Sequence, residues 1–364
     1  MIIRIPVNKI DARKIPLFFL FTIAWIIFAL NYFNPDFSVY KNVYDYGASG
    51  INTRIEFGYL LFTSIAKFIG LSFVQFRALL SFLGFAIIYS CLNEYTNQTT
   101  IIVLAYILYP FLFEAIQIRM FIVSVIILYS IRYLTDLSKT NLIRFLICIA
   151  LATSFHTSAI FYIILLLAYV NNERNVLFLS IIITAVELVL FNQSFLQRVI
   201  STLGFLGENL SLGMRYVSFN DSSKRLMLIY FVLEVISLFV LLICQDKEDN
   251  DSLYADNDIY IDIGYRTCLN KCMYITLTMI PLIEIGSSWG RVFRSSLIII
   301  YAAIANYPIR EIGTIAKYIK VLYIVGLSFL LFYAHVLTGS NNTYENVFRA
   351  MIENNYFFDI LFRY

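Results

Sequence analysis

Long apolar runs constrain this chain more than any other feature of its sequence. An α-helix needs about 20 apolar residues to cross the hydrocarbon core of a bilayer, which is about 30 Å thick. We identify eleven runs that approach this length, at 17–33, 73–92, 99–114, 118–135, 142–155, 157–171, 175–192, 226–244, 266–285, 289–306 and 318–337. The pattern therefore predicts an all-α polytopic integral membrane protein with about eleven transmembrane helices.

The composition excludes the soluble classes. The 364 residues are 60% hydrophobic and 14% charged, whereas an average soluble domain is about 45–50% apolar and about 25% charged. So few charges cannot cover a globule of this size, which excludes a soluble enzyme and a disordered chain. The net charge of +3 gives no argument for a nucleic-acid partner. We expect one integral membrane domain over residues 1–364, with the lipid bilayer as its surroundings.

The cysteines and histidines give no sign of a metal site. The five cysteines lie within or beside apolar runs, and none is in a loop with a second cysteine nearby. The two histidines, His156 and His335, are far in sequence from the closest cysteine pair, Cys268 and Cys272. We therefore expect no disulfide framework, no metal and no cofactor.

Basic residues precede the first apolar run and predict a cytoplasmic N-terminus. Alternating from there places the acidic segment 245–265 in the cytoplasm and three segments outside: 34–72, 193–225 and 338–364. Residues 57–70 are apolar but too short for a crossing, so we expect a re-entrant or interfacial helix there. The segment 193–225 contains an amphipathic stretch, and the aromatic tail 338–364 is expected to pack on the membrane surface or cap a cavity.

Arginines are concentrated at the expected outer ends of the helices, against the usual positive-inside trend. An ionisable group in hydrocarbon costs about 2.5–3.5 kcal/mol even on the lenient insertion scale, so it tends to face a cavity or a partner. The planar guanidinium matches phosphate oxygens, which favours an anionic ligand such as a diphosphate. The alternative is that these side chains extend to the lipid headgroups. The candidate diphosphate-binding residues are Arg77, Arg119, Arg215, Arg291 and Arg294.

Three side chains are candidates for a general base. His156 lies between two apolar runs, where it is either a general base near neutral pH or a hydrogen-bonded turn residue. Glu56 is either catalytic or a cap of the helix that follows it, and Asp45 lies in an aromatic-rich loop. Aromatic rings beside acids are typical of sugar sites. We therefore expect sugar-binding roles for Asp36, which can also be a turn residue, and for Tyr40, Tyr44, Tyr46 and Tyr59.

Four short motifs occur in an order that resembles a known family. They are Asn34-Pro35-Asp36 with the tyrosines that follow and then Glu56-Phe57-Gly58-Tyr59; Ile118-Arg119; Phe155-His156-Thr157-Ser158; and Gly290-Arg291. With them, the chain resembles the EpsG-like branch of the Wzy-type polysaccharide polymerases, which make O-antigen or exopolysaccharide. The sequence departs from the family pattern at Met120, where Gln is usual, and at Phe57, where Pro is often present.

The resemblance implies a membrane glycosyltransferase. A growing glycan would pass from undecaprenyl diphosphate to a lipid-linked repeat unit, so the donor and the acceptor are both undecaprenyl-diphosphate-linked oligosaccharides. The site would face the periplasm or the cell exterior from the bacterial cytoplasmic membrane, with a chain-length regulator as a further partner. Arg119 and Arg291 would hold the diphosphate, and His156 would act as the base or position the acceptor.

Two other classes of membrane protein also fit the residues. A flippase or transporter for lipid-linked oligosaccharides would need a cationic cavity too, but such proteins often show two related halves, which this sequence lacks. An acyltransferase acting on surface glycans could use a membrane histidine, but it would need a route for an acyl donor from the cytoplasm.

Overall fold

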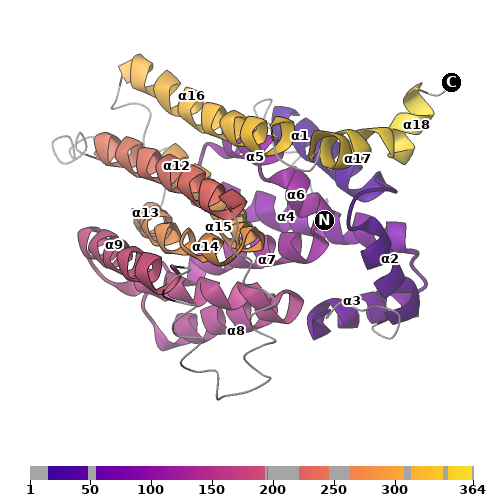
Figure 1. The fold of residues 1–364 in the computed structure, drawn as a ribbon, viewed down its shortest axis with the longest axis horizontal. Helices are drawn as coiled ribbons and strands as arrows, with labels where there is room; N and C mark the ends of the chain where they lie inside the picture. Colours follow the sequence, from indigo (N-terminus) through magenta and orange to yellow (C-terminus); the bar gives the residue numbers. More distant parts are fainter. Residues whose placement is uncertain are drawn as a thin grey trace, which may run out of the picture.

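The fold is a bundle of helices (Figure 1). The computed structural model describes residues 15–47, 55–192, 195, 221–245, 263–306, 313–338 and 343–362. Across these residues the secondary structure is helical, and an isolated bridge between Asn31 and Asn355 is the β-type pairing that they contain. The all-helical class predicted from the sequence is therefore confirmed.

The elements follow in chain order, with 3₁₀- and π-helical segments marked η. They are α1 (Ile15–Leu30), α2 (Phe37–Tyr46), α3 (Phe57–Phe68), α4 (Phe73–Tyr95), α5 (Thr99–Leu108), α6 (Phe111–Ile116), α7 (Ile118–Ser130), η3 (Ile131–Tyr133), α8 (Lys139–Phe155), η4 (Thr157–Tyr169), α9 (Glu173–Leu190), α12 (Asp221–Gln245), α13 (Ile263–Thr276), η6 (Leu277–Met279), α14 (Leu282–Ile285), η7 (Ser287–Trp289), α15 (Gly290–Ala305), α16 (Gly313–Phe332), η8 (Tyr333–Leu337), η9 (Tyr344–Arg349), α17 (Ala350–Glu353) and α18 (Tyr356–Phe362).

Each of the eleven apolar runs coincides with helix, but they differ in length. Within the described ranges, three helical stretches are long and apolar enough to cross a membrane: Phe73–Tyr95, Gly264–Ile285 and Lys320–Leu337. Others are shorter, such as α5, which ends at Leu108 just before Pro110; proline lacks the N–H group that continues a helix. Several runs are thus broken helices, and the number of eleven crossings stays a prediction.

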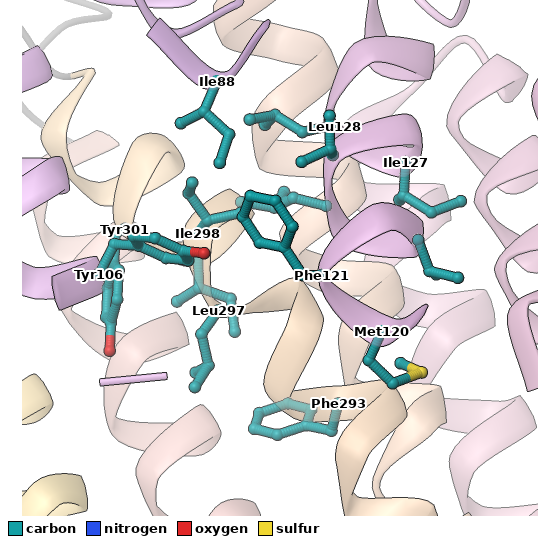
Figure 2. Close-up of a cluster of buried hydrophobic side chains, with 14 of the residues drawn as sticks. Ile88, Tyr106, Met120, Phe121, Ile127, Leu128, Phe293, Leu297, Ile298 and Tyr301 are labelled. Carbon is teal, nitrogen blue, oxygen red and sulfur yellow. The ribbon is translucent and has the colours of Figure 1, made fainter. Parts of the chain in front are cut away.

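Helix α15 is the centre of the bundle. Nearly all its side chains from Val292 to Ala305 are buried, and α5, α7, α12, α13 and α16 pack around it. A helix that is apolar on every side belongs in such a position. Figure 2 shows part of this core, in which Phe293, Leu297 and Ile298 of α15 belong to one cluster with Phe121 of α7. The core fixes α15 firmly, and with it the two arginines of its first turn.

Helices α2, α3, α17 and α18 gather at one end of the bundle (Figure 1), which we call the site end. The C-terminal helices are tied to α1 there: Asn31 donates to the carbonyl of Asn354 (3.0 Å) and Asn355 donates to that of Ile26 (3.1 Å). The expected short helix at 57–70 is present as α3, with Phe57 and Phe68 72% and 92% exposed. The amphipathic stretch within 193–225 and most of the acidic segment 245–265 lie outside the described residues.

Candidate functional site

Four helices begin at one place at the site end. Glu56 is the N-cap of α3, Arg119 is in the first turn of α7, His156 is the N-cap of η4, and Arg291 is in the first turn of α15. Glu56 forms an ion pair with Arg119 and accepts a hydrogen bond from Thr157, the residue after His156. His156 in turn contacts Arg291. Helix N-termini carry partial positive charge, so this arrangement favours an anion.

Glu56 joins three of the helices. One of its carboxylate oxygens forms an ion pair with Arg119, whose Nε lies 3.5 Å from the hydroxyl of Tyr40. The other oxygen accepts hydrogen bonds from the backbone N–H (3.1 Å) and the hydroxyl (3.0 Å) of Thr157. Although burial opposes ionisation, Arg119 and the Thr157 N–H hold the pKa of Glu56 below its ordinary value. The carboxylate is thus charged and engaged at both oxygens.

The close approach of α3 to α8 places Glu56 beside η4. A Cβ atom added at Gly58 would lie 2.7 Å from the carbonyl oxygen of Ser154, near the end of α8. Any larger residue at this position would therefore push the two helices apart. Glycine at position 58 lets the N-terminus of α3 reach the junction between α8 and η4.

His156 lies at that junction, outside the helices on either side. Its Nδ1 is 2.8 Å from the hydroxyl of Ser158, and its Nε2 is 3.3 Å from a terminal nitrogen of Arg291. Nδ1 also accepts from the backbone N–H of Ser158 (3.2 Å), so each ring nitrogen faces an N–H donor, one from Ser158 and one from Arg291. Burial, and then the charges of Arg291 and Arg119, lower the pKa of His156 to about 4. The imidazole is therefore neutral at neutral pH.

The first turn of α15 supplies two guanidinium groups. Arg291 donates from Nε to the carbonyl of Ser288 (2.7 Å), which fixes its orientation. Arg294, three residues on, donates to the side-chain oxygen of Gln117 (3.0 Å), and its guanidinium lies 4.5 Å from the ring centre of Phe113. Both side chains keep further N–H donors that can bind an anion.

Asp36 completes the group from the start of α2. Burial raises the pKa of its carboxyl, and the nearby charges of Arg291 and Arg119 act against this rise. Asp36 therefore lies within electrostatic range of both arginines. We call Asp36, Tyr40, Glu56, Arg119, His156, Arg291 and Arg294 the arginine–histidine cluster.

The remaining sugar-site candidates occupy different surroundings. Tyr59 is buried against Tyr40, with ring centres 5.4 Å apart. Tyr44 donates its hydroxyl to the carbonyl of Leu71 (2.5 Å) and packs on Phe76. Tyr46 is 70% exposed at the end of α2. Tyr59 thus supports the cluster through Tyr40, whereas Tyr44 holds α2 against the start of α4.

The other candidates lie away from the cluster or outside the described residues. Asp45 forms an ion pair with Lys41, one turn earlier on the exposed face of α2. Arg77 is fully buried in α4 and donates to the carbonyls of Phe28 (2.7 Å) and Asn31 (2.5 Å), where it caps the end of α1. Arg215 lies outside the described residues.

Three further side chains bind members of the cluster, although the sequence did not mark them as site residues. Thr157 binds Glu56, Ser158 binds His156, and Gln117 binds Arg294. The first two follow directly after His156, at the start of a helix, where hydroxyl side chains commonly serve as caps. Gln117 precedes Ile118-Arg119 and carries no comparable signal.

The cluster can bind an anion and accept a proton. It offers Arg291 and Arg119 near a neutral imidazole and a third guanidinium, Arg294, near Arg291, which suits a ligand with more than one negative charge. In the part of the chain that the structure describes, no group of three or more His, Cys, Asp or Glu side chains is arranged to hold a metal ion. The guanidinium groups and the imidazole of the cluster can supply electrostatic stabilisation and proton transfer.

Comparison with known proteins gives one match. The sequence pattern of the EpsG family matches residues 14–349, a range that contains every residue of the cluster. No curated protein and no solved structure matches the chain.

Proposed function

Because the chain belongs to the EpsG family of membrane proteins that resemble polysaccharide polymerases, we propose that it polymerises a lipid-linked glycan. In this reaction a growing glycan leaves undecaprenyl diphosphate and joins a lipid-linked repeat unit at the outer face of the bacterial cytoplasmic membrane. The residues that carry the reaction are those of the arginine–histidine cluster.

The observation that carries this proposal is the meeting of Arg119, Arg291 and His156. These residues come from three helices that are distant in sequence, yet Arg291 lies 3.3 Å from His156 and the charges of both Arg291 and Arg119 act on the imidazole. A diphosphate leaving group gains negative charge as its bond to the sugar breaks. Oriented cationic donors stabilise this developing charge more than the ground state, which is the condition for catalysis.

The contacts favour His156 over Glu56 as the base. The carboxylate of Glu56 already accepts from Arg119 and Thr157 at its two oxygens, so a substrate hydroxyl would have to displace one of them. The Nε2 of His156 has only the 3.3 Å contact with Arg291 to exchange, and it accepts the proton in the tautomer whose ring proton is on Nδ1, beside the Ser158 hydroxyl. Asp45 is engaged with Lys41 on the exposed face of α2. Glu56 then acts by orienting Arg119.

The proposed step is a substitution at the anomeric carbon of the donor sugar. The acceptor hydroxyl forms the new C–O bond and gives its proton to Nε2 of His156. The bond to the diphosphate oxygen breaks, and the lipid diphosphate leaves with its charge held by Arg119, Arg291 and Arg294. Asp36 and Tyr40 adjoin these arginines, so we place the sugar hydroxyls on them, with Tyr46 farther along α2.

A polymerisation assay tests the proposal. Purified protein is incubated with undecaprenyl-diphosphate-linked repeat units, without a nucleotide sugar, and the products are separated on a gel. The proposal predicts a ladder of longer glycans whose initial rate of formation falls by about a hundredfold or more in Arg119→Ala, Arg291→Ala and His156→Ala. The matched control is Arg349→Ala, an exposed arginine that pairs with Glu345 and Glu353. Movement of intact lipid-linked units across a vesicle membrane, without a ladder, would instead identify a flippase.

A further inference from the structure

A second feature of the structure is an apolar groove beside η4. Its volume is about 430 Å³, and it opens to the surface. The lining side chains come from η4, the residue after it and one residue of α9, and are Ile163, Ile164, Leu166, Leu167, Tyr169, Val170 and Ile183. Both η4 and α9 pack on α13, and α13 is drawn beside α9 in Figure 1.

The groove lies along η4, whose N-terminus is part of the candidate site. Residue Thr157, the first of η4, binds Glu56, and the preceding residue, His156, contacts Arg291. A 3₁₀-helix rises about 2.0 Å per residue, so Ile163 lies about 12 Å along the helix from Thr157. A ligand whose head is bound at the cluster can therefore lay its tail directly into the groove.

The position of the lining residues along η4 indicates how long a lipid tail must be to fill the groove. By the same rise of about 2.0 Å per residue, the lining extends from about 12 Å to about 26 Å beyond Thr157. Half of the hydrocarbon core is only about 15 Å thick. With Thr157 at the outer edge of the hydrocarbon, an acyl chain of an outer-leaflet phospholipid would end near the start of the groove, whereas a long polyprenyl chain would run through it.

We propose that the groove between η4 and α9 binds the polyprenyl chain of the lipid-diphosphate substrate, which positions the diphosphate at the arginine–histidine cluster. This inference rests on the proposed function, because it takes the lipid-linked glycan as the ligand. The groove then sets the preference of the protein for long lipid chains, separately from the chemistry at the cluster.

Two exposed isoleucines give a matched pair of variants. Ile163 lines the groove and is 42% exposed, whereas Ile181 of α9 is 50% exposed and does not line it; it lies two residues before Ile183, on the opposite side of α9. Tryptophan at position 163 fills the groove, while tryptophan at position 181 adds the same bulk away from it. Neither side chain is in the core, so both variants are expected to fold.

The experiment compares undecaprenyl- and farnesyl-diphosphate-linked repeat units as substrates. We expect the wild-type protein and Ile181→Trp to prefer the undecaprenyl substrate in kcat/KM. In Ile163→Trp this preference falls by about tenfold, the size of a small misfit in a hydrophobic pocket, with the farnesyl substrate turned over as before. An unchanged preference in Ile163→Trp, or none in the wild-type protein, would overturn the proposal.

A labelling experiment separates failure of this inference from failure of the proposed function. Photoreactive undecaprenyl phosphate and a photoreactive phospholipid are each added to the protein in nanodiscs, and labelled peptides are mapped. Preferential labelling of residues 163–170 by the polyprenyl probe supports the groove even if no ladder forms. Equal labelling by both probes shows ordinary annular lipid and overturns the inference even where the ladder forms.

Discussion

The ion pair between Glu56 and Arg119 offers the sharpest test of how the cluster is organised. Glu56→Gln keeps the size of the side chain and an oxygen that can accept from Thr157, but it removes the charge that faces Arg119. The Arg119 guanidinium is then no longer held in place. We expect glycan polymerisation to slow while the protein remains folded.

The burial of the pair sets the size of the effect. The side chains of Arg119 and Glu56 are 16% and 15% exposed, so the pair is intermediate between exposed pairs, worth about 0–1 kcal/mol, and buried pairs, whose disruption costs about 3–5 kcal/mol. A loss of about 2 kcal/mol is therefore expected. If the whole of this free energy stabilises the transition state and not the bound substrate, kcat/KM falls by about 30-fold.

The assay is the initial rate of ladder formation for the wild-type protein, Glu56→Gln, Arg119→Ala and the double variant. Because Glu56 acts through Arg119, the double variant should be no slower than Arg119→Ala alone. Glu345→Gln, which removes a charge from an exposed pair with Arg349, is the control and should keep the wild-type rate. Additive losses in the double variant, or a wild-type rate in Glu56→Gln, would refute the reasoning.

Three further predictions follow from the same geometry. Arg291→Lys keeps the charge but not the guanidinium fork, and should lower kcat by about a hundredfold, as loss of an oriented donor does; a wild-type kcat would count against a role for the fork. The pKa of His156, lowered from 6.5 to about 4, leaves the imidazole neutral down to that value, so the acid limb of kcat/KM should have its midpoint near pH 4 and move upward in Arg291→Ala. Since the folded protein binds fewer protons than the unfolded chain in this range, stability should fall as the pH drops below about 6.5; a midpoint near 6.5 would show that burial and the arginines do not lower the pKa of the base. Gly58→Ala should destabilise the protein by about 1–3 kcal/mol because its Cβ would meet the Ser154 carbonyl, whereas Gly326→Ala, with nothing within 4 Å, should not; equal melting temperatures would contradict this packing.

The helical segments could be predicted well because their signal is local. Apolar runs mark helices through the cost of exposing a backbone in hydrocarbon, and each predicted run coincides with helix in the structure. The breaks inside runs were harder to predict. Pro110 signals the end of α5, but the change to a 3₁₀-helix from Thr157 onward depends on packing and has no marker in the sequence.

The meeting of charged residues could be predicted only where they coincide with helix starts. Glu56, Arg119, His156 and Arg291 all lie at helix starts, so a common position at one end of the bundle could be inferred from topology. Arg77 has the same appearance in the sequence, but it turns inward to the carbonyls of α1, a partnership that only the three-dimensional arrangement of α1 and α4 creates.

Local pairs explain two other differences. Asp45 has Lys41 four residues before it, and this spacing favours an ion pair on the helix surface, as the structure shows. Tyr44 and Tyr59 suggest a sugar surface by composition, but which tyrosines face inward depends on how α2 and α3 pack against α4. Residue type alone therefore indicated the kind of site, and the packing decided its members.

The release of free lipid diphosphate, measured together with the glycosidic linkages formed, tests the central claim most directly. If the arginine–histidine cluster holds the leaving group, purified wild-type protein will release one undecaprenyl diphosphate for each linkage that it forms, and Arg291→Ala will lose release and linkage formation together. Linkages that form without release, or release at the wild-type rate in Arg291→Ala, would contradict the account.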